Sequence, residues 1–308
     1  IHITIIMKNI VFISNTSWYL FNFRMNLIHA MLDEGFRVIS VAPRDKYSQS
    51  IKNAGCLFIP VNVSRRSINI ITDIKLCIKL FSIYRKFSPI LVHHFTIKPV
   101  IFGSIAARLA SVPKIVNSIT GLGFVFSQKI MIIKLISFLY RIILRFSKSD
   151  LIFQNPDNKQ YFIDNKIAQE NKTSLIYGSG VNVEKFSMKN INISRMSEID
   201  RAEVNFLLFS RMIWDKGVKE YVDSAIQTFA TFPETHFYLI GASDFGNPNM
   251  IPEAWLKEIG TTTCITWIDH VEDIKPWILS SDIIVLPTFY NEGVPLSLIE
   301  AASFEKPI

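Results

Sequence analysis

Two glutamates near the end of the chain lie on either side of a short turn. Glu292 and Glu300 are eight positions apart in NEGVPLSLIEA, with a Gly and a Pro between them. The preceding run DIIVLP reads as a buried strand, and Pro295 suits the first turn of a helix. Glu292 is therefore expected in a strand-to-helix loop and Glu300 in the helix that follows. Such loops line ligand crevices, where carboxylates suit the hydroxyl groups of sugars.

A second pair of charged residues follows another apolar run. In FLLFSRMIWDKGVKEYV, Arg211 and Lys216 lie five positions apart after a predicted strand, and Gly217 precedes a predicted helix. Two cations that converge on one loop suit a diphosphate, because Arg offers a planar fork and Lys a compact charge. A strand that ends in Arg and is followed by Lys-Gly also occurs by chance, so this pattern alone is a modest signal.

Apolar, β-rich runs alternate with helical patterns along the whole chain, and this order must position both pairs. Runs such as NIVFIS, FRVISVAP, PILVHHF and DLIFQN lack clean alternation, which is typical of parallel strands covered by helices on both faces. A second series begins at VNFLLFS and continues through HFYLIGA, CITWI and DIIVLP. Repeated β–α units of this kind predict an α/β protein with doubly wound sheets.

The chain of 308 residues is long enough for two domains, and its charge is divided. Up to Arg195 it carries 26 Lys/Arg against 9 Asp/Glu, and from Met196 onward 7 against 17. The change coincides with the polar stretch 187–203, the best linker candidate. We therefore predict domains over residues 1–190 and 191–308, the first with an anionic partner. A chance drift in surface charge is the alternative.

The two ends of the sequence and its cysteines add further expectations. The segment before Met7 is not a signal peptide, and Met7 is the expected natural start. The second α/β series stops at Ile308 just after one helix, so we expect a fragment whose C-terminal domain is incomplete and binds its ligand poorly or is inactive.

Three dispersed cysteines argue against a disulfide scaffold or a zinc site and favour a reducing compartment. They are Cys56, Cys77 and Cys264.

The apolar segment KIMIIKLISFLYRIILRFSKSD carries four cations that fall within about 60° of one another on a helix. They are Lys134, Arg141, Arg145 and Lys148, and the segment IKLCIKLFSIYRKF repeats the spacing with Lys75, Lys79 and Lys86. A membrane span would cost about 2.5–3.5 kcal/mol for each buried charge. We therefore predict helices that lie on an anionic membrane surface. The alternative is a sheet-covering helix with a solvated basic edge; no nucleic-acid motif occurs.

Taken in order, the motifs are more specific than either charged pair. GVNVEKF, SRMIWDKG, FYLIGA and DIIVLPTFYNEGVPLSLIEA resemble the retaining glycosyltransferases of family 4, which have the GT-B fold. The resemblance implies two Rossmann-like doubly wound domains facing a cleft, the C-terminal one truncated here. It implies that Arg211 and Lys216 hold the donor diphosphate, that Glu300 binds ribose hydroxyls and that Glu292 faces the donor sugar. The implied donor-binding set further includes Gly217, Val271, Gly293, Val294, Pro295 and Leu296.

The N-terminal half is similar to bacterial members that act on undecaprenyl-diphosphate-linked sugars in O-antigen, capsule or N-glycan precursor assembly. The elements that carry this similarity are FNFRMNLIHAML, HHFTIKPVIFGSIAARLA and VPKIVNSITGLGFVF. It implies a catalytic His94 beside the cleft, although a lone strand-end histidine is more often structural. His93 and His94 alternate faces, so at most one of them points inward. The implied acceptor residues are Arg24, Lys98, Gly121 and Gly123.

Several features depart from the family pattern. The first loop, SNTSWYLFNFR, lacks the glycines of many relatives, Asn182 replaces a usual acidic residue, and ITWIDHVED lacks a common glycine. These departures leave the implied reaction class intact but weaken the detailed claims about the donor. The DFG tripeptide at 244–246 stands without the other kinase motifs. No D-x-D pair occurs, so we expect no cofactor and no obligatory Mg²⁺ or Mn²⁺.

We therefore expect a hexosyltransferase that moves a hexose or N-acetylhexosamine from a UDP-sugar to a lipid-linked saccharide acceptor with retention. It would work as a peripheral protein on the cytoplasmic face of the membrane, in the biosynthesis of bacterial surface polysaccharide. One rival is a UDP-N-acetylhexosamine 2-epimerase, which the basic helices disfavour because it needs no membrane acceptor. The other is a non-catalytic membrane-binding protein, which the four charged residues of the two motifs disfavour.

Overall fold

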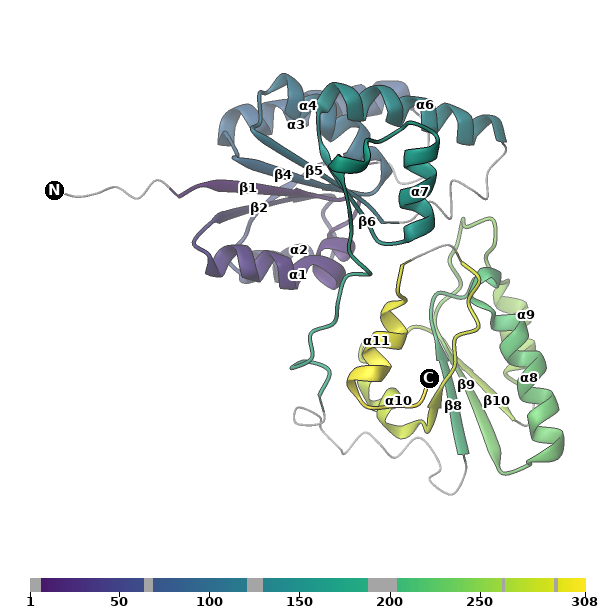
Figure 1. Ribbon diagram of the computed structural model, residues 1–308. Helices are drawn as coiled ribbons and strands as arrows, with labels where there is room; N and C mark the ends of the chain where they lie inside the picture. The colour runs from purple at the N-terminus through teal and green to yellow at the C-terminus, as the bar shows by residue number, and fades with distance from the viewer. Residues whose placement is uncertain (1–6, 64–68, 121–129, 188–203, 262–263, 291–292) are drawn as a thin grey trace. The chain divides into compact units, whose positions relative to one another are not determined.

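The computed structural model describes residues 7–63, 69–120, 130–187, 204–261, 264–290 and 293–308. The chain forms two compact units, Ile1–Ser179 and Gly180–Ile308, each with its own parallel sheet (Figure 1). The predicted boundary between residues 190 and 191 lies outside the described residues, as do residues 1–6 and nearly all of the predicted linker.

The described part of the first unit forms a seven-stranded parallel sheet in the order β3-β2-β1-β4-β5-β6-β7. The strands are β1 (Asn9–Ile13), β2 (Arg37–Ala42), β3 (Leu57–Pro60), β4 (Leu91–Phe95), β5 (Lys114–Ile119), β6 (Asp150–Phe153) and β7 (Thr173–Leu175). The strand order reverses between β1 and β4. In open α/β sheets ligands bind at the carboxyl ends of the strands beside such a reversal.

Helices cover both faces of this sheet, with α3, α4 and α6 on one face and α1 and α2 on the other (Figure 1). Side-chain caps fix where several of them begin: the Thr16 hydroxyl accepts from the Tyr19 N–H, and the Asn69 side chain accepts from the Thr72 N–H. The helices are α1 (Ser17–Asp33), α2 (Ser48–Asn53), α3 (Ile70–Phe87), the π-helical turn η1 (Pro99–Gly103), α4 (Ser104–Leu109), α6 (Ile130–Ser147), α7 (Pro156–Asp164) and the 3-10 turn η2 (Glu170–Lys172).

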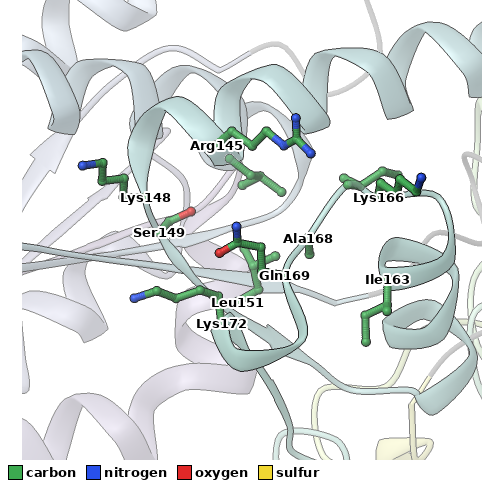
Figure 2. A pocket seen from close by; sticks show the side chains of 11 residues that line it. Arg145, Lys148, Ser149, Leu151, Ile163, Lys166, Ala168, Gln169 and Lys172 are labelled. Atoms are coloured by element: carbon green, nitrogen blue, oxygen red, sulfur yellow. The ribbon is translucent and has the colours of Figure 1, made fainter.

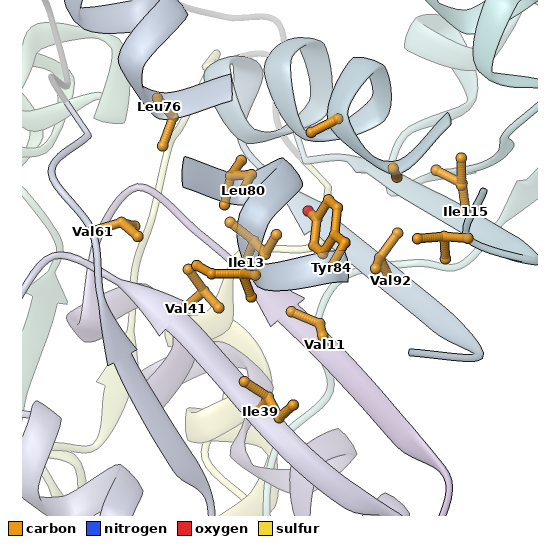
Figure 3. Close-up of a cluster of buried hydrophobic side chains, with 14 of the residues drawn as sticks. Val11, Ile13, Ile39, Val41, Val61, Leu76, Leu80, Tyr84, Val92 and Ile115 are labelled. Carbon is orange, nitrogen blue, oxygen red and sulfur yellow. The ribbon is translucent and has the colours of Figure 1, made fainter. Parts of the chain in front are cut away.

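Successive strand residues enter different cores because their side chains alternate between the faces of the sheet. Val11 and Ile13 of β1 pack with Leu80 and Tyr84 of α3 in the cluster shown in Figure 3. Ile10 and Phe12 of the same strand pack on the other face, against α1. Burial on both faces explains why these strands are apolar throughout.

The second unit repeats the architecture on a smaller scale. Its described residues form a parallel sheet in the order β10-β9-β8-β11. The strands are β8 (Val204–Phe209), β9 (Thr235–Ile240), β10 (Ile265–Ile268) and β11 (Ile283–Ile284). The helical elements are the 3-10 turn η5 (Trp214–Lys216), α8 (Val218–Thr231), α9 (Glu253–Ile259), α10 (Lys275–Ser280) and α11 (Leu296–Ser303). Figure 1 shows α8 and α9 on one face and α10 and α11 on the other.

The two predicted doubly wound α/β sheets are confirmed, and each quoted apolar run contains a strand. The last of these runs gives a strand of only two residues, β11. Residues 180–187, which lie before the predicted boundary, belong by their contacts to the second unit. There Phe186 packs on Phe304, the residue that directly follows α11, with ring centroids 6.0 Å apart.

Candidate functional site

The carboxyl ends of β8 and β11 form the switch point of the second sheet, because these neighbouring strands reverse the strand order. The loops that follow them, residues 210–217 and 285–290, are hydrogen-bonded to each other. The Phe289 N–H and the Thr288 hydroxyl both donate to the Asp215 carbonyl, at 3.0 and 3.2 Å. The predicted diphosphate loop therefore lies against the segment that follows β11.

Gly217 lies where these two loops approach each other most closely. Its φ of 74° is left-handed, and a Cβ placed on it would stand 2.1 Å from the Pro287 carbonyl oxygen. A side chain is thus excluded by the backbone conformation and by the neighbouring chain. This glycine lets the chain turn from Lys216 into α8 directly beside the second loop.

Replacing Gly217 with alanine is expected to destabilise the second unit by roughly 2–4 kcal/mol, because a backbone clash adds to left-handed strain. Gly180→Ala is the matched control, since Gly180 has a φ of 71° and open space around an added Cβ. It should lose only about 1 kcal/mol. Urea unfolding of both variants measures the difference. Equal losses would show that the contact with Pro287 does not require glycine.

The two predicted cations stand over one aromatic ring, that of Tyr290. The Arg211 guanidinium carbon lies 6.0 Å and the Lys216 Nζ 5.6 Å from its centre. Lys216 is only 6% exposed, whereas half of the Arg211 side chain is exposed. The negative face of an aromatic ring attracts cations at such distances, most strongly where water is excluded. The structure therefore places two positive charges in one partly desolvated corner.

A third loop, after β9, completes this corner. Asp244 accepts from Arg211 through Oδ2 at 2.8 Å and from the Asn247 side-chain amide at 3.0 Å. An ion pair with one half-exposed partner contributes at most about 1 kcal/mol to stability. Its main effect is geometric, because it keeps the Arg211 side chain at the mouth of the corner. The loops after β8, β9 and β11 thus supply Arg211, Asp244 and Tyr290 in turn.

Glu300 lies in α11, within its second turn. Burial raises the pKa of its carboxyl group to about 7, against the attraction of Lys185, which lowers it. The helix begins after Pro295, so its first N–H groups lack helical partners at the carboxyl edge of the sheet. A carboxyl group with a pKa near neutrality is typical of binding and catalytic sites.

Of the other predicted donor residues, the structure describes all but Glu292. Gly293, Pro295 and Leu296 are half-buried and Val294 is exposed along the approach to α11. Val271 follows β10 and packs against the apolar cluster that contains Ala301 of α11. Glu292 lies outside the described residues, so its role facing the donor sugar stays a prediction.

The sequence predicts that His94 is a catalytic residue facing the cleft, but the structure buries its side chain. It has no exposed surface; its Nδ1–H donates to the Asn117 side-chain oxygen at 2.7 Å, and its Nε2 accepts from the Tyr84 hydroxyl at 2.9 Å. Gly103 lies directly on the ring, where an added Cβ would come within 2.6 Å of it. Burial lowers the pKa of His94 to about 4, against the hydrogen bond to Asn117. His94 is therefore a neutral core residue that cannot touch a substrate in this structure.

The predicted acceptor residues are Arg24, Lys98, Gly121 and Gly123, and the two glycines lie outside the described residues. Arg24 of α1 is 8% exposed; it donates to the Tyr19 hydroxyl at 2.6 Å and lies 4.6 Å from the centre of the Phe95 ring. Lys98, just after β4, donates to Asp73 of α3 at 2.6 Å. Both cations therefore brace elements at the carboxyl edge of the first sheet, and their acceptor role stays a prediction.

The predicted basic stripes lie on helices whose outer surfaces are also apolar. Lys75, Lys79 and Lys86 on α3 and Lys134 and Arg145 on α6 are exposed, and Arg141 is half-buried. α6 ends at Ser147, and the next residue, Lys148, has a left-handed φ of 54° that ends the helix. The prediction that Lys148 lies on the helical stripe is therefore wrong. Exposed apolar residues accompany both stripes: Ile70, Ile71, Ile74, Ile78 and Phe81 on α3, and Phe138, Leu139, Ile142 and Phe146 on α6.

Within the described part of the chain, no helix combines the length and apolarity needed to cross a membrane.

The sequence patterns do not predict Asp244 and Tyr290, although both follow strands of the second sheet. The rule that carboxyl strand ends line a crevice is the signal that could have found them. In the sequence Asp244 stands out only as part of an isolated DFG tripeptide, and Tyr290 as one aromatic residue beside the more conspicuous Glu292.

Two family matches cover most of the chain. Residues 9–155 match the glycosyl transferase 4-like family, and residues 203–308 match the glycosyl transferases group 1 family. An N,N'-diacetylbacillosaminyl-diphospho-undecaprenol alpha-1,3-N-acetylgalactosaminyltransferase of Campylobacter jejuni is 28% identical over 96% of this chain and 78% of its own length. A UDP-Gal:alpha-D-GlcNAc-diphosphoundecaprenol alpha-1,3-galactosyltransferase of Escherichia coli is 27% identical over 79% of this chain and 62% of its own length.

Solved structures share the fold at low identity. A glycosyltransferase from Rickettsia africae matches with a TM-score of 0.77 and 17% identity, over 97% of this chain and 78% of that one. HepE of Anabaena, crystallised with UDP and glucose, matches with a TM-score of 0.76 and 17% identity, over 98% and 79%. A structure from Listeria monocytogenes that is assigned as a UDP-N-acetylglucosamine 2-epimerase matches less well, with a TM-score of 0.58 and 11% identity over 90% of this chain and 73% of that one.

Proposed function

The chain belongs to the GT-B glycosyltransferases, and on this premise we propose that it transfers a hexose or N-acetylhexosamine from a UDP-sugar to a lipid-linked saccharide with retention. The relatives from Campylobacter jejuni and Escherichia coli, whose names state diphosphoundecaprenol-linked saccharides, support this acceptor class. The observation that carries the proposal is the pair of cations, Arg211 and Lys216, over the Tyr290 ring at the switch point of the second sheet.

The cations suit the departure of a nucleoside diphosphate. The bond between the anomeric carbon and the diphosphate oxygen breaks, and the acceptor hydroxyl oxygen bonds to the same carbon. Negative charge then grows on the diphosphate, where Arg211 and Lys216 stabilise it without reorganisation of solvent. The acceptor proton passes to the departing phosphate oxygen in a front-face mechanism, which needs no covalent nucleophile. Glu300 binds ribose hydroxyls through its ionised carboxylate.

The same cations bear on metal dependence. Arg211 and Lys216 provide positive charge at the leaving group, which is the role that Mg²⁺ has in many phosphate sites. We therefore propose that the transfer requires no divalent metal ion and no further cofactor. Glu292 is proposed to face the donor sugar, as its place in the family motif implies.

A membrane surface is the proposed setting for the acceptor. The exposed lysines of α3 and the exposed cations of α6 lie among exposed apolar side chains, on helices that cover one face of the first sheet. Cations of this kind gain roughly 1 kcal/mol each near an anionic leaflet, and the apolar side chains gain by entering the acyl boundary. We propose peripheral binding to the cytoplasmic leaflet through these two helices.

Charged substitutions on these helices are expected to weaken vesicle binding. Ile78 of α3 is 60% exposed and Ile142 of α6 is 50% exposed, so a glutamate at either position should fold normally. The double variant Ile78→Glu/Ile142→Glu should bind phosphatidylglycerol vesicles at least ~10-fold less tightly in sedimentation assays. Ile226→Glu, at a 51% exposed position of α8, should bind like the unaltered protein. Equal losses in both variants would contradict the assignment of the membrane surface.

The function is tested by following UDP release from a panel of UDP-sugars, with and without polyprenyl-diphosphate-linked saccharides. The full-length protein should release UDP from one donor only when a lipid-linked acceptor is present, and at the same rate in EDTA. Conversion of a free UDP-sugar to its 2-epimer without any lipid would instead assign an epimerase. Binding to vesicles with no turnover on any donor would assign a non-catalytic membrane protein.

A further inference from the structure

A cavity of about 570 Å³ opens at the amino-terminal edge of the first sheet, the edge opposite the carboxyl ends of the strands (Figure 2). The end of α6, the turn into β6 with Leu151, the end of α7 with the loop after it, and the last residue of η2 surround it. Its lining residues therefore come from four segments that the folded sheet holds together. None of them belongs to the candidate site of the second unit.

Four cationic side chains form the rim of this cavity, and no carboxylate lines it among the described residues. They are Arg145, Lys148, Lys166 and Lys172, and Figure 2 shows their charged ends at its outer side. Lys172 pairs with Asp150 at 3.2 Å; within the described part of the chain, the other three have no carboxylate partner. The ends of α6 and α7 offset about half a charge each. About two of the four positive charges at the rim are therefore uncompensated.

Two of these lysines hold an unusual backbone conformation. Lys148 and Lys166 have φ values of 54° and 53°, and their N–H groups close the ends of α6 and α7 on the carbonyls of Leu144 and Ile163. Glycine is the usual residue at such helix ends, and a longer side chain there costs about 1 kcal/mol. Ser88, Ser111 and Glu305 hold the same conformation at other helix ends, so it fixes where the two lysines leave their helices and is not in itself a sign of a ligand.

The centre of the cavity differs in chemistry from its rim. Its surface is largely apolar, with Leu151, Ile167 and Ala168 beside the polar groups of Ser149 and Gln169. Figure 2 shows Leu151, Ser149 and Gln169 in the space between the cationic side chains. A ligand that fits both regions carries a phosphate for the rim and methylene or glycerol carbons for the centre.

The cavity lies at the end of α6, one of the two helices proposed to bind the membrane. Arg145 lines the cavity, and the next residue, Phe146, is one of the exposed apolar side chains of that helix. We propose that this cavity binds the phosphate headgroup of one anionic phospholipid, with the phosphate among the lysines and the glycerol over the apolar centre. The inference rests on the peripheral membrane association proposed above and adds to it a specific headgroup site.

The test uses calorimetric titration of the full-length protein with dioctanoyl-phosphatidylglycerol, kept below its micelle concentration. A saturable site with one lipid per chain is expected, and Lys148→Gln/Lys166→Gln should weaken it at least ~10-fold, as expected from the loss of two charge-assisted contacts. Lys52→Gln, at an exposed position of α2 on the other face of the sheet, should change the affinity less than about twofold. Dioctanoyl-phosphatidylcholine, whose choline carries a compensating positive charge, should bind at least ~10-fold more weakly.

The proposal would be overturned by no saturable binding, by equal affinity in the double lysine variant, or by equal weakening in Lys52→Gln. Glycerol 3-phosphate that binds as tightly as the lipid would also overturn it and would assign the cavity to a soluble phosphate ester. Because the lipid is monomeric and no sugar is transferred, the outcome is independent of bilayer binding and of transferase activity. Failure of the headgroup site is thus distinguishable from failure of the proposed function.

Discussion

Lys216→Met is expected to lower kcat/KM for the UDP-sugar by about 10²–10³-fold, the usual effect of removing one group that stabilises a developing charge. Lys216 is 6% exposed and its Nζ stands 5.6 Å from the Tyr290 ring, so its charge acts where little water competes. The interaction strengthens as the diphosphate departs, so the loss should appear mainly in kcat and less in KM.

Lys219→Met is the matched control for this substitution. Lys219 lies three residues further on, its side chain is 60% exposed, and it pairs with Asp223 on the surface of α8. Its kcat/KM should stay within about twofold of the unaltered enzyme. Circular dichroism melting of both variants checks that the second unit remains folded. A Lys216→Met enzyme that melts normally and turns over at full rate would remove Lys216 from the site.

Glu300→Gln is expected to stabilise the protein at pH 8 while it weakens donor binding. Burial raises the pKa of the Glu300 carboxyl from 4.5 to about 7, so between these values the folded state holds a proton that the unfolded chain has lost. The stability that this proton provides is fully present below pH 4.5 and is lost as the pH rises through 7. At pH 8 the ionised carboxylate therefore costs roughly 2–3 kcal/mol, allowing for its partial exposure.

The stability half of this prediction is read from thermal melting between pH 5 and pH 8. Glu300→Gln should melt above the unaltered protein at pH 8, and the gap should close as the pH falls below about 5. Glu258→Gln, at an exposed position of α9, serves as the control and should follow the unaltered protein at every pH. A gap that stays constant with pH would show that Glu300 is not held with a raised pKa.

Glu300→Gln is expected to weaken donor binding at pH 8, although it stabilises the fold at that pH. An ionised Glu300 accepts hydrogen bonds from ribose hydroxyls, and bonds to a charged group contribute about 1.5–3 kcal/mol. Glu300→Gln should therefore raise the KM for the UDP-sugar by roughly 10- to 100-fold at pH 8. In the unaltered enzyme, donor affinity should rise as the pH increases through 7 and Glu300 ionises. An unchanged KM in the variant would exclude a contact between this carboxylate and the donor.

The strands and both charged motifs could be predicted from the sequence because they depend on local pattern. Arg211 and Lys216 are five residues apart after one strand, so any α/β fold brings them to one loop. Their common neighbour Tyr290 could not be predicted in the same way. It comes from the loop after β11, and its approach depends on a glycine that fits against Pro287.

His94 shows where pattern reasoning reaches its limit. Strand alternation predicts that His93 and His94 face opposite sides of the sheet, and they do. The alternation does not reveal what covers each face. On the side of His94, Tyr84, Asn117 and the turn that ends at Gly103 close over the ring. A histidine at a strand end can thus serve the core when helices cover both faces.

Transfer of a radiolabelled sugar into an organic-extractable product tests the central claim most directly. The full-length protein is incubated with a labelled UDP-sugar and a polyprenyl-diphosphate-linked saccharide, and the label is partitioned between water and butanol. We expect butanol-soluble label only with the lipid acceptor, its near-complete loss in Lys216→Met and its retention in Lys219→Met. Label that stays in water under every acceptor condition, while the UDP-sugar is consumed or isomerised, would contradict lipid-directed transfer.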